Sequence, residues 1–252
     1  MAFTDILAQL LADSRTRAFA MGRPLVTLSY AQSMDGCITT RRGASLALSC
    51  EESKFLTHQL RAAHDGILVG IGTVLADDPR LTARMVGGPH PQPVILDGNL
   101  RIPHNSRLLS RPDSKPWLVC GDGTAAEDWH RLEEIGVRVI AVPIDQQGYL
   151  DLDQTLRVLF ELGMVSLMVE GGARVIASFL RRRLVDQVVV TVSPVWVGGL
   201  PVSETSLDRE GCFPQWIHPE MKKFGRDWVI WGRIGEGKYE TAGPVFPGAT
   251  SG

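Results

Sequence analysis

Short apolar runs alternate with helix-forming segments along most of this 252-residue chain. Apolar runs bounded by glycine, proline or polar residues indicate buried strands, and apolar residues that recur at helical spacing indicate helices. The strands predicted in this way are residues 25–30, 67–69, 93–96, 117–120, 137–142, 166–169, 188–192 and 228–234. Because neither a linker nor an internal repeat interrupts the alternation, we predict a single α/β domain. Its central sheet is mostly parallel and flanked by helices, with antiparallel strands near the end.

The same patterns give the boundaries of this domain. Residues 1–24 are predicted as a helical extension that packs on the body, because residues 4–20 carry apolar residues at helical spacing. The main domain is predicted over residues 25–234, and the Gly- and Pro-rich residues 235–252 as a loose tail. Residues 49–52 have the pattern of a capping box, which predicts a helix reaching Ala63 with Phe55, Leu56 and Leu60 on its inner side.

Composition excludes several classes of function. The chain has 26 Lys and Arg against 28 Asp and Glu, a formal net charge of −2 and no long basic run, which argues against a nucleic-acid partner. No apolar stretch approaches the length of a membrane span, and the first residues lack a signal-peptide layout, so we expect a cytoplasmic protein. The four cysteines show neither a C-x-x-C pair nor metal-ligand spacing with the six histidines. We therefore expect reduced thiols and no metal site.

The stretch from Asp65 to Arg84 has the strongest local pattern. A predicted strand ends at Gly70, and Gly72 lets the backbone approach a ligand closely. A short helix over residues 73–76 would point its first N–H groups into the opening, where they could bind an anion. The stretch nevertheless matches only the first half of the dinucleotide fingerprint G-x-G-x-x-G, since Leu75 occupies the third glycine position. By itself it is compatible with a nucleotide site or with a plain strand-to-helix turn.

Charged residues near other strand ends are open to two interpretations as well. Asp35 precedes Gly36 directly after the first strand, so it either forms an Asp-Gly turn or supplies a functional carboxylate. Glu170 precedes two glycines and is either an acid capping the next helix or a substrate contact. Arg61, near the end of the second predicted helix, is either a solvated charge or a binding residue.

Three motifs taken together carry a family resemblance. They are Ser-Met-Asp-Gly at residues 33–36, Gly-Thr-Val-Leu-Ala-Asp-Asp-Pro at residues 72–79 with Leu81 and Arg84, and Val-Glu-Gly-Gly at residues 169–172. In this order and spacing, the chain resembles the riboflavin-biosynthesis reductase family, the C-terminal reductase module of the bacterial bifunctional deaminase-reductase. The resemblance covers residues 25–199. It implies a dihydrofolate-reductase-like fold, a homodimer, and NADPH-dependent reduction of a ribosylamino-pyrimidine 5′-phosphate to its ribitylamino form in riboflavin biosynthesis.

The resemblance also implies roles for particular residues. Asp35 would be catalytic, orienting the substrate or assisting proton delivery. Arg61 and Arg84 would converge on the substrate phosphate. The implied substrate contacts are Ser45, Arg61, Leu81, Arg84 and Glu170. The implied NADPH contacts are Ala31, Thr73, Asp77, Gly98, Gly172, Ala173, Arg174, Val175, Ile176, Ala177 and Ser178, and the last seven would hold the pyrophosphate at a helix start.

Departures from the family pattern keep other functions open. The zinc motifs of the fused deaminase, H-x-E and P-C-x-x-C, are absent, Ala47 stands where one member has a tryptophan, and Gly98 replaces a hydroxyl residue. One alternative is an NADPH reductase of another heterocycle, such as a dihydrofolate-like pterin. Another is a non-catalytic nucleotide-binding relative. Whether the pyrimidine is deaminated before or after reduction is also open.

Overall fold

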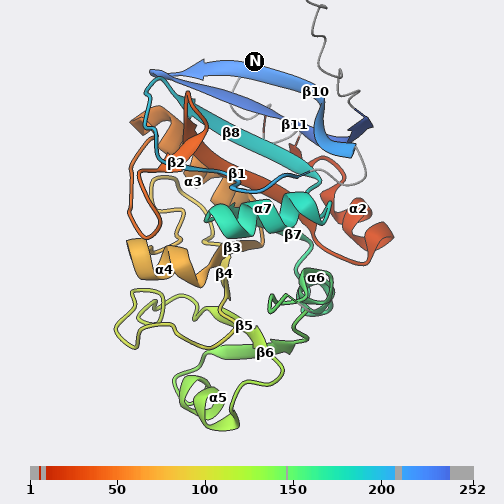
Figure 1. The fold of residues 1–252 in the computed structure, drawn as a ribbon. Coiled ribbons are helices and arrows are strands. Elements are labelled where there is room, and N and C mark those ends of the chain that lie inside the picture. The colour runs from red at the N-terminus through yellow and green to blue at the C-terminus, as the bar shows by residue number, and fades with distance from the viewer. Residues whose placement is uncertain (1–5, 7–9, 146, 208–211, 239–252) are drawn as a thin grey trace, which may run out of the picture.

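The fold is built on one nine-stranded sheet with the strand order β10-β11-β8-β1-β7-β3-β4-β5-β6 (Figure 1). The computed structural model describes residues 6, 10–145, 147–207 and 212–238. The strands from β8 across to β6 run parallel, whereas β11 and β10 are antiparallel additions at one edge. The nine strands are β1 (Leu25–Ser33), β3 (Gly66–Gly70), β4 (Gln92–Leu96), β5 (Trp117–Gly121), β6 (Arg138–Val142), β7 (Ser166–Gly171), β8 (Gln187–Ser193), β10 (Cys212–Phe224) and β11 (Asp227–Lys238).

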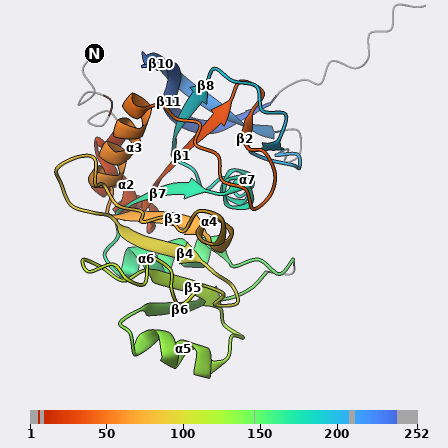
Figure 2. The ribbon, with the colours of Figure 1, turned by 90° about the vertical axis from the view of Figure 1, so that its left-hand side faces the viewer.

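Helices cover both faces of the sheet, as Figure 2 shows for α3 and α7 on opposite sides of the central strands. They are α2 (Ser14–Met21), α3 (Glu51–Ala63), α4 (Ile71–Asp77), α5 (Ala126–Glu133), α6 (Leu152–Glu161) and α7 (Ala173–Arg181). Two short strands, β2 (Cys37–Thr39) and β9 (Leu200–Pro201), form a separate ribbon. The prediction of one α/β domain with a mostly parallel sheet is therefore confirmed, including the antiparallel strands near the end.

The alternation of side chains along β1 separates the two main cores. Val26 and Leu28 pack with α6 and α7, in a cluster centred on Phe179. On the opposite face of the sheet, Met168 of β7 and Val189 of β8 pack with Leu56 and Leu60 of α3. Strand β3 is apolar and buried along its whole length, as expected when a parallel strand is covered on both faces. The registers of the parallel pairs bring the ends of β1, β7, β3 and β4 to one edge of the sheet, where the site described below lies.

The structure corrects several local predictions. Asp13 adopts a left-handed φ of 58°, and α2 begins only at Ser14, so residues 4–20 are not one continuous helix; residues 1–5 and 7–9 lie outside the described residues. The capping box is wrong, because Cys50 is the N-cap of α3 and makes no side-chain cap hydrogen bond. Phe55 is 43% exposed rather than inward. Strand β11 runs to Lys238, past the predicted start of the tail, and residues 239–252 lie outside the described residues.

The structure gives two observations, one on membrane-spanning helices and one on the cysteines. Within the described part of the chain, no helix combines the length and apolar character needed to cross a membrane. All four cysteines fall in the described residues and carry free thiols.

Candidate active site

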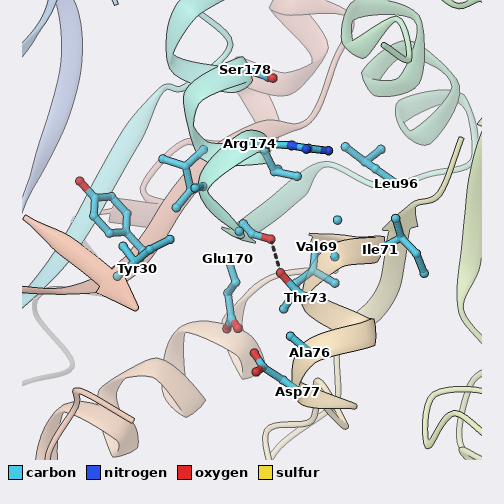
Figure 3. Close-up of a pocket in the computed structure, with 18 of the residues that line it drawn as sticks. Tyr30, Val69, Ile71, Thr73, Ala76, Asp77, Leu96, Glu170, Arg174 and Ser178 are labelled. Atoms are coloured by element: carbon cyan, nitrogen blue, oxygen red, sulfur yellow. Dashed lines mark hydrogen bonds between the residues drawn. The ribbon is translucent and has the colours of Figure 1, made fainter. Parts of the chain in front are cut away.

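A cavity of about 910 Å³ opens at the carboxyl ends of β1, β7, β3 and β4, and Figure 3 shows part of its lining. Its volume falls in the range of small-molecule and cofactor sites. The elements that follow these strands form its walls, namely the α4 start, the α7 start, the turn after β4 and part of α3. In open parallel sheets, ligands bind at this edge of the strands. Position and size together make this cavity the candidate active site.

Glycines bring the β3–α4 and β7–α7 turns close together. Gly171 and Gly172 have φ values of 87° and 100°, which favour glycine over any residue with a side chain. A Cβ at Gly172 would lie 2.8 Å from the Thr73 hydroxyl, and one at Gly70 would lie 2.8 Å from a Val175 methyl. The Thr73 hydroxyl donates to the Gly171 carbonyl oxygen at 2.9 Å, which joins the two turns (Figure 3). The lack of side chains here leaves backbone bordering the cavity.

The start of α7 offers free amide donors to this space. Gly172 is the N-cap and supplies no side-chain cap, and the first intrahelical bond runs from the Ile176 N–H to the Gly172 carbonyl at 3.1 Å. The amide groups that precede Ile176 in the first turn therefore have no intrahelical acceptor. Together with the positive end of the helix dipole, they favour an anionic group at this place.

A buried ion pair forms the opposite wall. Arg61 of α3 donates from Nε and Nη2 to the two carboxylate oxygens of Glu170, at 2.6 and 2.7 Å, and from Nη1 to the Thr82 carbonyl at 3.1 Å. Both side chains are at most 16% exposed and both border the cavity. Burial disfavours the charged guanidinium, but the facing carboxylate more than offsets this, and the pKa of Arg61 is raised. Glu170 is thus bound by Arg61 and does not cap α7.

Hydrogen bonds to the Asp35 carboxylate link the loop after β1 to the loop after β8. Its carboxylate accepts hydrogen bonds from the Ser33 hydroxyl and from the backbone N–H groups of Val197 and Gly198, the last two at 3.1 and 2.6 Å. These bonds, that of Ser33 above all, favour the charged form and hold the pKa of Asp35 well below its usual range. Asp35 is not among the residues that line the cavity. Its geometry suits a residue that positions the loop after β8; the catalytic role predicted for it stays a prediction.

Most of the other predicted site residues do line the cavity. Arg84 and Ala177 do not: Arg84 is exposed, and its guanidinium donates to the Thr82 hydroxyl at 3.4 Å. The structure therefore does not bring Arg84 together with Arg61 in this cavity. The predicted residues that border it are Ala31, Ser45, Arg61, Thr73, Asp77, Leu81, Gly98, Glu170, Gly172, Ala173, Arg174, Val175, Ile176 and Ser178.

Polar residues that the sequence patterns did not mark also border the cavity. They include Ser29, Tyr30, Thr57, Asn99, Arg101, Tyr149 and Thr191. Burial raises the pKa of Tyr30 to about 12, so its phenol stays neutral. Arg101 could have been found from the sequence, because it follows a predicted strand end within a few residues. Thr191 gave no signal, because it lies inside an apolar run and only the assembled sheet places it beside the cavity.

One carboxylate of the lining is free to accept new hydrogen bonds. Glu170 is bound by Arg61, and Asp145 accepts from Arg182 and from the backbone of its own turn. Within the described residues, Asp77 has neither a hydrogen bond nor an ion pair, and Figure 3 shows it extending towards Glu170. The cavity thus combines bound charges that shape it with at least one acid that can interact with a ligand.

Comparison with known proteins identifies the family. The model of the RibD C-terminal domain family matches residues 24–230. The chain belongs to this family. A 2,5-diamino-6-ribosylamino-4(3H)-pyrimidinone 5′-phosphate reductase of Debaryomyces hansenii is 37% identical over 199 residues, which cover 72% of this chain and 80% of that protein. A reductase of the same name from Archaeoglobus fulgidus is 34% identical over 222 residues, covering 84% and 99%.

A solved structure of the same family agrees in fold. The riboflavin biosynthesis reductase of Saccharomyces cerevisiae superposes with a TM-score of 0.70 and 29% identity, covering 91% of this chain and 99% of that one. The family predicted from the three motifs is confirmed. The family match spans residues 24–230, from β1 to the first residues of β11, so it includes every strand that borders the cavity.

Proposed function

We propose that this protein reduces a ribosylamino-pyrimidine 5′-phosphate to its ribitylamino form in riboflavin biosynthesis, with NADPH as the cofactor. The observation that carries the proposal is the cavity itself. It lies where the two glycine turns meet at the carboxyl ends of parallel strands, in a chain 34–37% identical to proteins named as pyrimidinone phosphate reductases. The reductase class follows from the family, and the choice of cofactor and substrate is what the experiments below test.

The residues around the glycine turns fit a dinucleotide phosphate. The space beside Gly172 is one that a Cβ would fill, and the free amides at the start of α7 point to the place where a phosphate would approach. Gly172 and the α7 residues up to Ser178, with Ala31, Thr73, Asp77 and Gly98, would hold the cofactor. When bound, the nicotinamide supplies the hydride that reduces C1′ of the sugar.

The chain's own residues position the sugar and the base on the α3 side of the cavity. The Arg61–Glu170 pair fixes the Glu170 carboxylate, whose remaining lone pairs can accept from substrate N–H or O–H groups. Ser45 and Leu81 border the same space, and Ser45 offers a hydroxyl to it. Because the Asp35 carboxylate lies outside the cavity lining and already accepts from Ser33, Val197 and Gly198, it would act by positioning the loop after β8, and solvent would supply the proton that accompanies the hydride.

An NADPH-oxidation assay with three candidate substrates tests the proposal. The diamino-pyrimidinone ribosylamino phosphate and its deaminated uracil analogue are compared at equal concentration, with a pterin as the third substrate. We expect turnover with at least one of the two ribosylamino phosphates and none with the pterin. Turnover of the pterin alone would replace this proposal with the alternative reductase, and NADPH oxidation with none of the three would indicate a non-catalytic relative.

We infer that the functional unit is a homodimer formed through the β10–β11 hairpin. Strand β10 stands at the edge of the described sheet, and the hairpin exposes large apolar side chains: Trp216, Ile217, Met221 and Trp228, between 36% and 61% exposed. Light scattering after size exclusion tests this with Met221→Lys, and Ile135→Lys on the far side of the sheet is the matched control. We expect a dimer for the wild type and the control, and a monomer for Met221→Lys; an unchanged dimer would move the interface elsewhere.

A further inference from the structure

One face of α7 carries two arginines that the structure uses differently. Arg174, Ser178 and Arg182 follow each other at intervals of four residues, so they lie on the same side of the helix, and all three line the cavity. Arg182 is neutralised by Asp145, to which it donates a hydrogen bond, and it lies 3.9 Å from Asp153. Arg174 has no acceptor among the described residues, although it borders the same cavity.

Other arginines of the lining all have a partner. Arg42 pairs with Glu204, Arg61 with Glu170, and Arg181 donates to the Thr205 hydroxyl. Arg101 lies 3.8 Å from the buried Asp97. Within the described part of the chain, Arg174 is therefore the lining guanidinium whose donors are left for a molecule that enters the cavity.

The position of Arg174 is unfavourable without an anion. It stands in the first turn of α7, where the helix dipole opposes a positive charge. Figure 3 shows its guanidinium extended away from the helix start and towards Leu96 at the end of β4. The turn that follows Leu96 adds the Asn99 amide and the Arg101 guanidinium to the lining. The side-chain donors near the end of β4 are thus separate from the backbone amides at the start of α7.

We propose that Arg174 binds the 2′-phosphate of NADPH and thereby makes the protein prefer NADPH to NADH. This inference rests on the proposed function and adds to it the origin of cofactor choice. Both dinucleotides carry the diphosphate that suits the amides at the α7 start, whereas only NADPH carries a second phosphate, on the adenosine ribose. A planar guanidinium can donate two hydrogen bonds to that phosphate. The Arg174 guanidinium lies in the same cavity, apart from the amides at the start of α7.

Binding measurements on the full chain test this without turnover. Affinities for NADPH, NADH, 2′,5′-ADP and 5′-ADP are determined by calorimetry or by nicotinamide fluorescence for the wild type and for Arg174→Gln. Because the loss of a charge-assisted phosphate contact weakens binding by about tenfold to a hundredfold, Arg174→Gln should lose that much affinity for NADPH and 2′,5′-ADP. Affinity for NADH and 5′-ADP should remain close to that of the wild type.

Two further variants sharpen the result. Arg174→Lys keeps the charge and should retain part of the preference. Arg181→Gln makes the same charge change on the same helix, at a residue that donates to Thr205, and should leave the preference intact. An equal loss of NADPH and NADH affinity in Arg174→Gln would place the side chain at the diphosphate and overturn the inference, and so would an undiminished preference. A wild type that binds neither dinucleotide would overturn the proposed function as well.

Discussion

Asp35 lies two residues past the end of β1, Glu170 lies one residue before the end of the neighbouring β7, and glycine follows each of them. The two turns use these carboxylates in opposite ways. The Asp35 carboxylate accepts from Ser33, Val197 and Gly198, and lies outside the lining of the cavity. The Glu170 carboxylate pairs with Arg61 and borders the cavity beside the glycines that open it. One turn closes on itself and on a neighbouring loop, whereas the other leaves room for a ligand.

The comparison shows what decides the role of an acid at a strand end. Strand topology places both acids at the ligand-binding edge of the sheet, so position alone does not separate them. The hydrogen-bond partners of the two carboxylates separate their roles, and these partners come from distant parts of the chain. Arg61 is 109 residues from Glu170, and Gly198 is 163 residues from Asp35. Each of the following changes tests one side of this contrast.

The largest effect is expected from breaking the ion pair at Glu170. Glu170→Met leaves the Arg61 charge buried without its carboxylate, which should lower the free energy of unfolding by about 3 kcal/mol. In the double variant Arg61→Met/Glu170→Met no charge is left unpaired, so most of this stability should return. Urea denaturation measures both variants. If Glu170 also contacts the substrate, kcat/KM in the refolded double variant should stay reduced by at least about tenfold.

The outcome separates structure from recognition at this turn. A double variant with both stability and activity restored would make Glu170 a structural acid, like Asp35. A double variant as unstable as the single one would show that the methionines do not pack there and that the buried charge is not the cause.

The second effect concerns the glycines beside Glu170. Gly172→Val forces a branched residue into a φ of 100° and places its Cβ 2.8 Å from the Thr73 hydroxyl. We expect NADPH affinity, measured by fluorescence titration, to fall at least about tenfold, equivalent to about 1.4 kcal/mol. Gly123→Ala is the matched control, because nothing lies within 4 Å of a Cβ there, its φ is not in the left-handed region and it does not line the cavity. Unchanged affinity in a folded Gly172→Val protein would move the phosphate site away from this turn.

Asp35→Asn tests the closed turn through its pH dependence. The hydrogen bonds hold the folded-state pKa of Asp35 below its unfolded value of about 3.9, so the charged carboxylate stabilises the fold fully above that pH. As the pH falls towards the folded-state pKa, this contribution is lost. The melting temperature of the wild type should therefore exceed that of Asp35→Asn at pH 7, and the difference should shrink below about pH 4. A difference that does not change with pH would mean that the charge is not what holds the loop.

The local elements were predictable where short-range patterns decide them. Buried strands such as β3 and β7 show as apolar runs, and Asp151 caps α6 by accepting from the Gln154 N–H, three residues away. The cap of α3 was not predictable. Asp227, at the start of β11, accepts from the Cys50 N–H at 2.7 Å and from the Ser53 hydroxyl, which replaces the expected capping box.

The same limit applies to the candidate site. The glycine turns could be predicted, because the backbone conformation at Gly172 and the close approach at Gly70 both require glycine, and glycine is visible in the sequence. Strand β10 was missed because Pro214 and Pro219 interrupt it and charged residues follow, a pattern that suits an edge strand but resembles a loop. Which charges are already paired cannot be seen from the sequence, since it depends on contacts across the finished sheet.

Arg84 gives the smallest expected effect and the clearest disagreement between motif and geometry. The family pattern predicts a phosphate contact there, and its loss would raise KM for the pyrimidine phosphate by about ten- to a hundredfold. In the structure Arg84 is exposed and outside the cavity lining, and an exposed charge of this kind contributes at most about 1 kcal/mol, or about fivefold. We therefore expect Arg84→Ala to raise KM by less than about fivefold, with NADPH affinity unchanged. A tenfold or larger rise, absent with the dephosphorylated substrate, would show that the loop carrying Arg84 closes onto the bound phosphate, and the substrate side of the cavity would then be completed only when the ligand arrives.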